Sequence, residues 1–314
     1  MKQFDERFMA SLRSQNNLLN QVVAYMMQRR GKGLRPLLVL LTAKVFGPVT
    51  EQAYRSAVLI ETFHTASLLH DDVVDKSDIR HGSLTVNTKW SADIAVLLGD
   101  FMLSKALDDA LANRDYALLR EASEVVTEMS EGEMLQKEKA ILLDITEEEY
   151  FRIIRQKTAA LLALCAKAGA ESAGCPPETC ARLQQFGYHL GMAFQIKDDL
   201  FDLALKPGEA ETGKPRGNDL RERKITLPFI HALREAPSGE RKAMLRLLEK
   251  GPQLTEEDVA TVSAWVVRYG GIAYAEQKMQ EFHQEADRIL QKFADRPHIS
   301  GLKRLLDFVV QRAY

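Results

Sequence analysis

Two short acidic segments have the composition of a metal-assisted diphosphate site. Residues 71–75 read Asp-Asp-Val-Val-Asp, and residues 198–202 read Asp-Asp-Leu-Phe-Asp. At about 100° per residue, carboxylates at positions i, i+1 and i+4 lie on one side of a helix. Carboxylates this close repel one another unless a cation is near, and hard oxygen ligands select Mg²⁺-like ions that commonly bridge to phosphate oxygens. Two such segments therefore indicate a polyphosphate held through metal ions. The candidate ligands are Asp71, Asp72, Asp75, Asp198, Asp199 and Asp202.

Compact groups of basic residues accompany the acidic segments. Lys32 and Arg35 stand three positions apart beside two glycines, just before an apolar helix-like run. A helix start attracts anions, so this pair could hold one diphosphate directly. Acidic clusters and cations together indicate two diphosphate sites, one bound through metal and one bound directly. The other basic candidates are Arg80, His81, Lys214 and Lys224.

Polar side chains also interrupt apolar helix faces. His64 falls on the same face as Asp71, and Gln195 on the same face as Asp198. Lys157, followed by Thr158, occupies a position where an apolar residue is expected. A lysine that faces a core is costly unless it meets a negative partner. The alternatives are a lysine that snorkels at the edge of the core and a histidine that only packs within it.

The elements that must position these groups are helices almost throughout. Convincing runs of strict apolar alternation are absent. Thr146 with Glu149, and Thr255 with Asp258, have the spacing of helix caps. Residues 206–219 form the longest irregular stretch, and a loop of that length is typical of a functional segment. The sequence predicts one all-α domain over residues 1–314, in which the two acidic helices face each other across a central cavity.

The bulk composition excludes several classes of protein. The 314 residues carry 42 basic and 44 acidic side chains, and the net charge of -2 gives no reason to expect nucleic acid or an anionic membrane as a partner. The most apolar short run, residues 36–43, is too short for a transmembrane segment. The first residues lack the apolar core of a signal peptide. Three cysteines form no metal-ligand spacing, which favours structural thiols in a reducing, cytoplasmic location.

In chain order, these segments resemble those of the trans-type polyprenyl diphosphate synthases over nearly the whole length. The resemblance implies an all-α fold of long antiparallel helices around a deep pocket. It also implies a homodimer in which each subunit carries a complete site. The matching segments are Gly31-Lys32-x-x-Arg35-Pro36, residues 64–75, Arg80-x-Gly82, Glu131-Gly132-Glu133-x-x-Gln136, Lys157-Thr158-Ala159, residues 195–202, Gly213-Lys214, Asp219-Leu220 and Lys224-x-Thr226-Leu227-Pro228.

The resemblance assigns roles to the candidate residues. It implies that an allylic diphosphate binds through about three Mg²⁺ ions to Asp71, Asp75 and Asp198. Asp72, Asp199 and Asp202 would complete the clusters or hold bound water. Family positions that contact the allylic diphosphate or its metals are matched by Arg80, Lys157, Gln195, Lys214 and Lys224. Those that bind isopentenyl diphosphate directly are matched by Lys32, Arg35 and His64.

The implied reaction is a chain elongation. Metals and cations stabilise the departing diphosphate, and the C–O bond breaks to give an allylic cation. The isopentenyl double bond attacks this cation, and loss of a proton leaves an allylic diphosphate longer by one isoprene unit. Thr158 and Gln195 would offer oxygen dipoles to the cation. The segment 206–224 would act as a lid against water.

The sequence departs from the family pattern beside the first motif. Many members have two arginines where this chain has Arg80 and His81. The second position helps to bind isopentenyl diphosphate, so we expect weaker or pH-dependent binding there, because histidine titrates near neutrality. Gly33 likewise replaces the commoner arginine after Lys32.

Two alternatives and the product length complete the expectations. A class I terpene cyclase would not need the second acidic motif or the Lys32 and Arg35 pair. A regulatory subunit would not need all six aspartates. The resemblance implies that bulky aromatics at the positions of Ala66 and Ser67 would stop growth at short products, although Phe63 could partly plug the path here. We therefore expect a product longer than four isoprene units, with geranylgeranyl diphosphate as the alternative.

Overall fold

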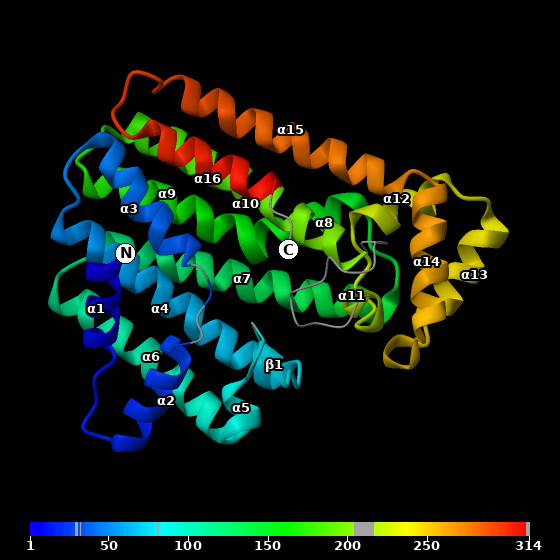
Figure 1. Cartoon of the computed structure of the whole chain (residues 1–314), viewed down its shortest axis with the longest axis horizontal. Coiled ribbons are helices and arrows are strands. Elements are labelled where there is room, and N and C mark those ends of the chain that lie inside the picture. Colours follow the sequence, from blue (N-terminus) through cyan, green and yellow to red (C-terminus); the bar gives the residue numbers. More distant parts are fainter. Residues whose placement is uncertain (29–30, 32, 81, 204–216, 312–314) are drawn as a thin grey trace. The chain divides into compact units, whose positions relative to one another are not determined.

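A computed structural model describes residues 1–28, 31, 33–80, 82–203 and 217–311. Helices make up most of these residues, as Figure 1 shows. The two short strands that it describes, β1 (Ile79–Arg80) and β2 (Ser83–Leu84), form one antiparallel pair. The predicted all-α class is confirmed.

The chain divides into two compact units. The first contains residues 1–126, 161–184 and 293–302, and the second contains residues 127–160, 185–292 and 303–314. The single domain expected over residues 1–314 stays a prediction.

The first unit is built around α4 (Glu51–Val74), which packs against α1 (Lys2–Ser11), α3 (Leu34–Phe46) and α6 (Ala92–Ala112). Thr50 caps α4, because its side chain accepts a hydrogen bond from the backbone N–H of Ala53. Helices α4 and α6 approach closely at Gly99, where an added Cβ would lie 2.3 Å from Nε2 of His70. The remaining elements of this unit are α2 (Asn17–Gln28), α5 (Val86–Lys89), the first part of α7 (Tyr116–Leu142), most of α9 (Ala160–Ser172), the start of α10 (Pro177–Asp202) and the start of α16 (Ile299–Gln311).

The second unit has its own apolar core. Buried side chains such as Ile196, Phe229 and Val266 pack together in it. Its elements are the rest of α7, α10 and α16, with α8 (Glu147–Ile154), η1 (Arg155–Ala159), α11 (Asn218–Arg221), α12 (Leu227–Glu235), α13 (Ser238–Leu248), η2 (Gly251–Gln253), α14 (Glu256–Arg268) and α15 (Gly271–Gln291). Both predicted capping boxes are confirmed: Thr146 with Glu149 opens α8, and Thr255 with Asp258 opens α14.

A π-helical turn interrupts the helix that Thr146 opens. Residues 155–159 form η1, between α8 and α9. Two glycines allow neighbouring helices to approach it: a Cβ on Gly132 would lie 2.7 Å from Cβ of Gln156, and one on Gly191 would lie 2.5 Å from Cα of Ala159. Such turns are frequent at functional sites, and this one brings Lys157 and Thr158 against α7 and α10.

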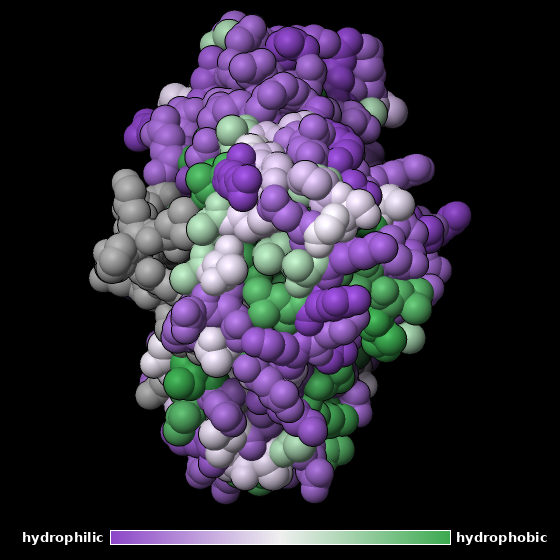
Figure 2. Space-filling view, turned by 90° about the vertical axis from the view of Figure 1, so that its right-hand side faces the viewer, coloured by the Kyte–Doolittle hydropathy of each residue, from purple (hydrophilic) through white to green (hydrophobic). Residues whose placement is uncertain are grey.

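On the face that Figure 2 shows, hydrophilic residues cover most of the surface and hydrophobic residues form limited patches. This distribution is ordinary for helices that face water. Among the described residues, none of the helices is long and apolar enough to cross a membrane.

Candidate functional site

The first acidic motif lies at the C-terminal end of α4. Asp71 is half-buried in the last turn, and Asp75 is exposed at the C-cap. Asp72 differs from both, because it is only 5% exposed. The three carboxylates of this motif therefore have different environments, although their spacing in the sequence does not reveal it.

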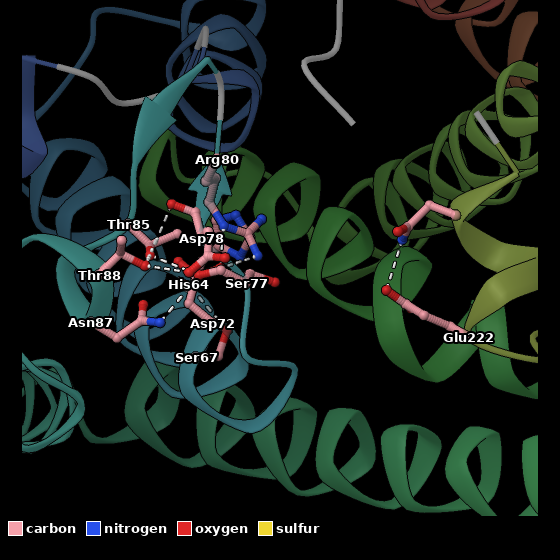
Figure 3. Close-up of polar contacts among 11 residues, drawn as sticks. His64, Ser67, Asp72, Ser77, Asp78, Arg80, Thr85, Asn87, Thr88 and Glu222 are labelled. Atoms are coloured by element: carbon pink, nitrogen blue, oxygen red, sulfur yellow. Dashed lines mark hydrogen bonds and ion pairs between the residues drawn. The ribbon is translucent and has the colours of Figure 1, made fainter. Parts of the chain in front are cut away.

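Asp72 is bound by Arg80. Nε and Nη2 of Arg80 each lie 2.8 Å from Oδ1 of Asp72. Figure 3 shows the two side chains side by side. The arginine comes from β1, a few residues beyond the end of α4. The motif thus contains one carboxylate that fixes a cation from the adjacent hairpin.

The hairpin that carries Arg80 is itself held by side chains (Figure 3). The hydroxyl of Thr85 donates to the backbone oxygen of Ser77 at 2.7 Å, and Nδ2 of Asn87 donates to the same oxygen at 3.1 Å. The hydroxyl of Thr88 donates to Oδ1 of Asp78 at 2.9 Å. We did not select these residues from the sequence. Turn-forming Ser, Thr, Asn and Asp around residues 77–88 were the available signal.

The candidate residues for isopentenyl diphosphate that the structure describes also lie in the first unit. Arg35 is in the first turn of α3, a helix whose N-cap is Gly33 with a φ of 64°. His64 is half-buried on α4, where its backbone oxygen accepts a 2.8 Å hydrogen bond from the hydroxyl of Ser67. Lys32 and His81 lie outside the described residues.

A cavity of about 250 Å³ lies beside the N-terminal half of α4. Val58 and Leu59 of α4 and Ala106 of α6 contribute apolar walls. Arg55 and Asp115 also line the cavity and form an ion pair, with Nε of Arg55 2.7 Å from Oδ2 of Asp115. One side of this cavity is therefore apolar and another is charged.

The second acidic motif lies in the last turns of α10. Asp198 and Asp202 are half-buried there. Oδ1 of Asp202 accepts from the backbone N–H of Asn218 at 3.0 Å, and Oδ2 accepts from that of Asp219 at 3.1 Å. Asp202 thereby anchors the start of α11.

Asp199 is 5% exposed and is bound at both carboxylate oxygens. The hydroxyl of Tyr150 donates to Oδ2 at 2.7 Å, and Nε2 of Gln195 donates to Oδ1 at 2.9 Å. Burial, followed by the nearby Asp219 carboxylate, raises the pKa of Asp199, whereas the hydrogen bonds from Tyr150 and Gln195 act in the opposite direction and favour the carboxylate. Burial and the charge of Asp199 likewise raise the pKa of Tyr150.

Lys157 and Thr158 both have partners within the second unit. Nζ of Lys157 lies 2.7 Å from Oε2 of Glu133 and donates to Oε1 of Gln136 at 3.0 Å. Glu133 is therefore the negative partner that a lysine on an otherwise apolar helix face needs. The hydroxyl of Thr158 donates to Oε1 of Gln195 at 2.7 Å.

The remaining cations are only partly described. Lys224 pairs with Glu222, which Figure 3 labels. Lys214 lies outside the described residues, as do residues 206–216 of the predicted loop.

The described candidate residues are divided between the two units. The prediction that the two motifs face each other across a cavity stays a prediction. The first unit holds Arg35, His64, Asp71, Asp72, Asp75 and Arg80, and the second holds Lys157, Thr158, Gln195, Asp198, Asp199, Asp202 and Lys224.

Each acidic motif separately offers carboxylate oxygens of the kind that a magnesium ion uses when it also binds phosphate. Within the described ranges, no three histidine, cysteine, aspartate or glutamate side chains form a group that could hold a metal ion by themselves. Mg²⁺ is typically bound through one or two carboxylates together with water and phosphate oxygens. Half-buried Asp71 and Asp198 and exposed Asp75 fit that role better than the two buried aspartates.

Comparisons with known proteins identify a family that this chain matches over most of its length. Residues 16–265 match the family model described as Polyprenyl synthetase. The octaprenyl diphosphate synthase of Escherichia coli K12 is 37% identical over 303 residues, which cover 96% of this chain and 92% of that protein. The short chain isoprenyl diphosphate synthase of Methanothermobacter thermautotrophicus is 36% identical over 288 residues, covering 90% and 87%. A crystal structure of a decaprenyl diphosphate synthase from Rhodobacter capsulatus superposes with a TM-score of 0.90 at 32% identity, covering 99% of this chain and 95% of that one.

Proposed function

The chain belongs to the polyprenyl synthetase family, and we propose that it is a Mg²⁺-dependent prenyltransferase. It condenses an allylic diphosphate with isopentenyl diphosphate, head to tail and repeatedly, to a trans-polyprenyl diphosphate longer than four isoprene units. The observation that carries the proposal is the shared organisation of the two acidic motifs. Each places one aspartate in the core, bound to a neighbouring polar side chain, and leaves another half-buried at a helix end.

Asp71, Asp75 and Asp198 are the proposed metal ligands. Mg²⁺ bound there would supply positive charge that stabilises the departing diphosphate. Arg80 adds a cation whose direction is set by Asp72. Since that contact uses Nε and Nη2, Nη1 is the nitrogen that we expect to meet a phosphate oxygen.

We also assign Lys157 to the allylic diphosphate. Its ammonium group forms an ion pair with Glu133. A phosphate oxygen would compete for the same ammonium group, which carries three donors. Lys214 and Lys224 complete the set of cations that we expect to contact the allylic diphosphate.

Isopentenyl diphosphate is assigned to Lys32, Arg35 and His64. Arg35 in the first turn of α3 adds its charge to the backbone N–H groups of a helix start. His81 would contribute a fourth contact. Because these basic side chains bind only the diphosphate, the double bond of isopentenyl diphosphate stays available to attack the allylic cation.

We propose that the growing tail follows α4 toward its N-terminus. Ala66 lies on that path and is fully buried, whereas Val58 and Leu59 line the cavity farther along. Leu59 is twelve residues from Asp71, which corresponds to about 18 Å along the helix axis. A product of more than four isoprene units is long enough to span that distance.

A homodimer is the proposed assembly. Helix α6 exposes large apolar side chains, including Leu97 at 63% and Leu111 at 53%. An apolar stripe of this kind is typical of an interface with a second copy. Sedimentation should show a dimer, and Leu97→Glu should shift it toward monomer. A monomeric wild type would contradict this assignment.

A cytoplasmic location is proposed because Cys165, Cys175 and Cys180 are not joined by disulfides.

The decisive experiment uses the purified chain alone. It is incubated with Mg²⁺, farnesyl diphosphate and labelled isopentenyl diphosphate, and the dephosphorylated products are sized. A ladder that extends beyond four units supports the proposal. If geranylgeranyl diphosphate is the final product, the assigned product is too long and the alternative of a geranylgeranyl diphosphate synthase is correct. A cyclic hydrocarbon would indicate a terpene cyclase, and no turnover without a partner protein would indicate a regulatory subunit.

A further inference from the structure

Four side chains in the second unit form one continuous line of hydrogen bonds. Tyr150 donates to Asp199 at 2.7 Å, Gln195 donates to Asp199 at 2.9 Å, and Thr158 donates to Gln195 at 2.7 Å. Tyr150 is 3% exposed, and Asp199 and Thr158 are each 5% exposed. Hydrogen bonds sheltered from water in this way are strong and hold their direction.

The direction of each bond follows from the line as a whole. Oδ1 and Oδ2 of Asp199 both act as acceptors, so the Gln195 amide turns its Nε2 toward the carboxylate. Its Oε1 then faces the opposite way and accepts the hydroxyl proton of Thr158. A threonine hydroxyl has one proton and two lone pairs, so Oγ1 of Thr158 is left with lone pairs only.

This polarity suits a site where positive charge develops. Oxygen lone pairs at Oγ1 of Thr158 and Oε1 of Gln195 stabilise a cation, whereas an O–H or N–H pointed at it would oppose it. If the Gln195 amide were reversed, Nε2 would donate to Thr158, and the threonine proton would be released to point toward the substrate. The carboxylate at the other end of the line prevents that reversal.

Building on the proposed function, we propose that Tyr150 and Asp199 are positioning residues. Asp199 orients the Gln195 amide, Tyr150 fixes Asp199, and together they keep Thr158 an acceptor toward the allylic cation. Asp199 acts through these hydrogen bonds and not as a metal ligand. Tyr150 on α8 thereby joins the functional residues, although it contacts no substrate.

The first test removes only the Tyr150 hydroxyl. Tyr150→Phe keeps the ring, which packs in the apolar core. We expect kcat to fall about tenfold, the effect of losing one buried hydrogen bond. The KM for each substrate and the Mg²⁺ concentration for half-maximal rate should change less than about twofold. In a Thr158→Val background the same substitution should have almost no further effect, because the group it acts through is absent. Additive losses, or an unchanged kcat in Tyr150→Phe, would overturn the proposal.

The second test separates positioning from metal binding. Asp199→Asn keeps an acceptor for Gln195, so it should retain clearly more activity than Asp199→Ala at an unchanged Mg²⁺ requirement. Asp198→Asn is the matched comparison and should raise that requirement, because Asp198 is a proposed ligand. An equal rise in both asparagine variants would show that Asp199 holds metal.

A spectroscopic test does not depend on turnover. In protein labelled with ¹⁵N-glutamine, the side-chain amide signal of Gln195 is assigned by its loss in Gln195→Glu. We expect this signal to move in Asp199→Ala and, to a smaller extent, in Tyr150→Phe, because both change its hydrogen bond. A signal that moves in neither variant contradicts the proposed line. Wild-type turnover separately tests the proposed function, so the two can fail independently.

Discussion

Arg80 contacts Asp72 through two guanidinium nitrogens, each 2.8 Å from Oδ1 of a carboxylate that is only 5% exposed. In the second motif, Asp199 has the same position in the pattern and the same exposure, and it accepts hydrogen bonds from Tyr150 and Gln195. The middle aspartate of each motif is therefore committed to a neighbouring side chain of its own unit. In both copies of the pattern, the middle aspartate positions a neighbouring side chain, and other aspartates of the motif are the proposed metal ligands.

The Asp72 and Arg80 pair should control binding of the allylic diphosphate. We expect Asp72→Ala to raise the KM for this substrate about tenfold, because Arg80 loses the contact that sets its direction. Asp72→Asn keeps an acceptor for Nε and should have a smaller effect. Steady-state kinetics with each substrate varied in turn will measure this. An effect of Asp72→Ala confined to isopentenyl diphosphate would contradict the assignment.

Both motifs should be needed for catalysis. Asp71→Ala and Asp198→Ala should each lower turnover by several orders of magnitude while the protein folds normally. Removing one charge from a group of like charges relieves repulsion in the metal-free protein, so the midpoint of thermal unfolding should stay the same or rise. Excess EDTA should abolish activity of the wild type. Full activity in EDTA, or near-normal turnover in either variant, would contradict the metal assignment.

Arg35 should act on the other substrate. Arg35→Ala is expected to raise chiefly the KM for isopentenyl diphosphate, because its charge stands in the first turn of α3. Arg80→Ala is the matched variant and should act chiefly on the allylic KM. Initial rates over a grid of both substrate concentrations will separate the two effects. If both variants change the same KM, the division of the cations between two sites is wrong.

An aromatic at Ala66 should shorten the product. Ala66 is fully buried on α4, so Ala66→Phe places a ring across the proposed path of the tail. Overpacking should also lower the free energy of unfolding by about 1–3 kcal/mol, which thermal unfolding will show. Ala106 of α6 lines the cavity beside the N-terminal half of α4. Ala106→Phe should therefore permit longer products than Ala66→Phe. An unchanged product ladder in Ala66→Phe would show that the tail does not pass this turn.

Stability should fall in mild acid through His189. Burial lowers the pKa of His189 from its usual value, and Glu285 offsets this only in part. The unfolded chain then binds more protons than the folded one, so stability is lost as the pH falls below the unfolded value of about 6.5 and toward the lowered folded value. Thermal unfolding of the wild type between pH 8 and pH 5 should show this loss, and His189→Gln should reduce it. His231, whose pKa burial also lowers, provides a second variant for comparison. An equal loss in wild type and both glutamine variants would assign it to other groups.

The sequence by itself determined the helical class, the two acidic motifs and the accompanying cations. Helix periodicity and capping boxes are local properties, and the boxes at Thr146 and Thr255 occur where their spacing placed them. The type and spacing of the six aspartates also indicated their chemistry, because carboxylates in such clusters need a cation.

Only the tertiary structure decided which aspartates are buried and what they contact. Asp71 and Asp72 are adjacent in the sequence, and helix geometry alone does not tell which of them meets Arg80. Likewise, Glu133 meets Lys157 and Tyr150 meets Asp199 because helices distant in the chain pack together, and Gly132 and Gly191 allow that close approach. The π-helical turn at residues 155–159 has no local signal that we recognised. It presents Thr158 to Gln195, and packing between helices, which a linear pattern does not encode, holds the two together.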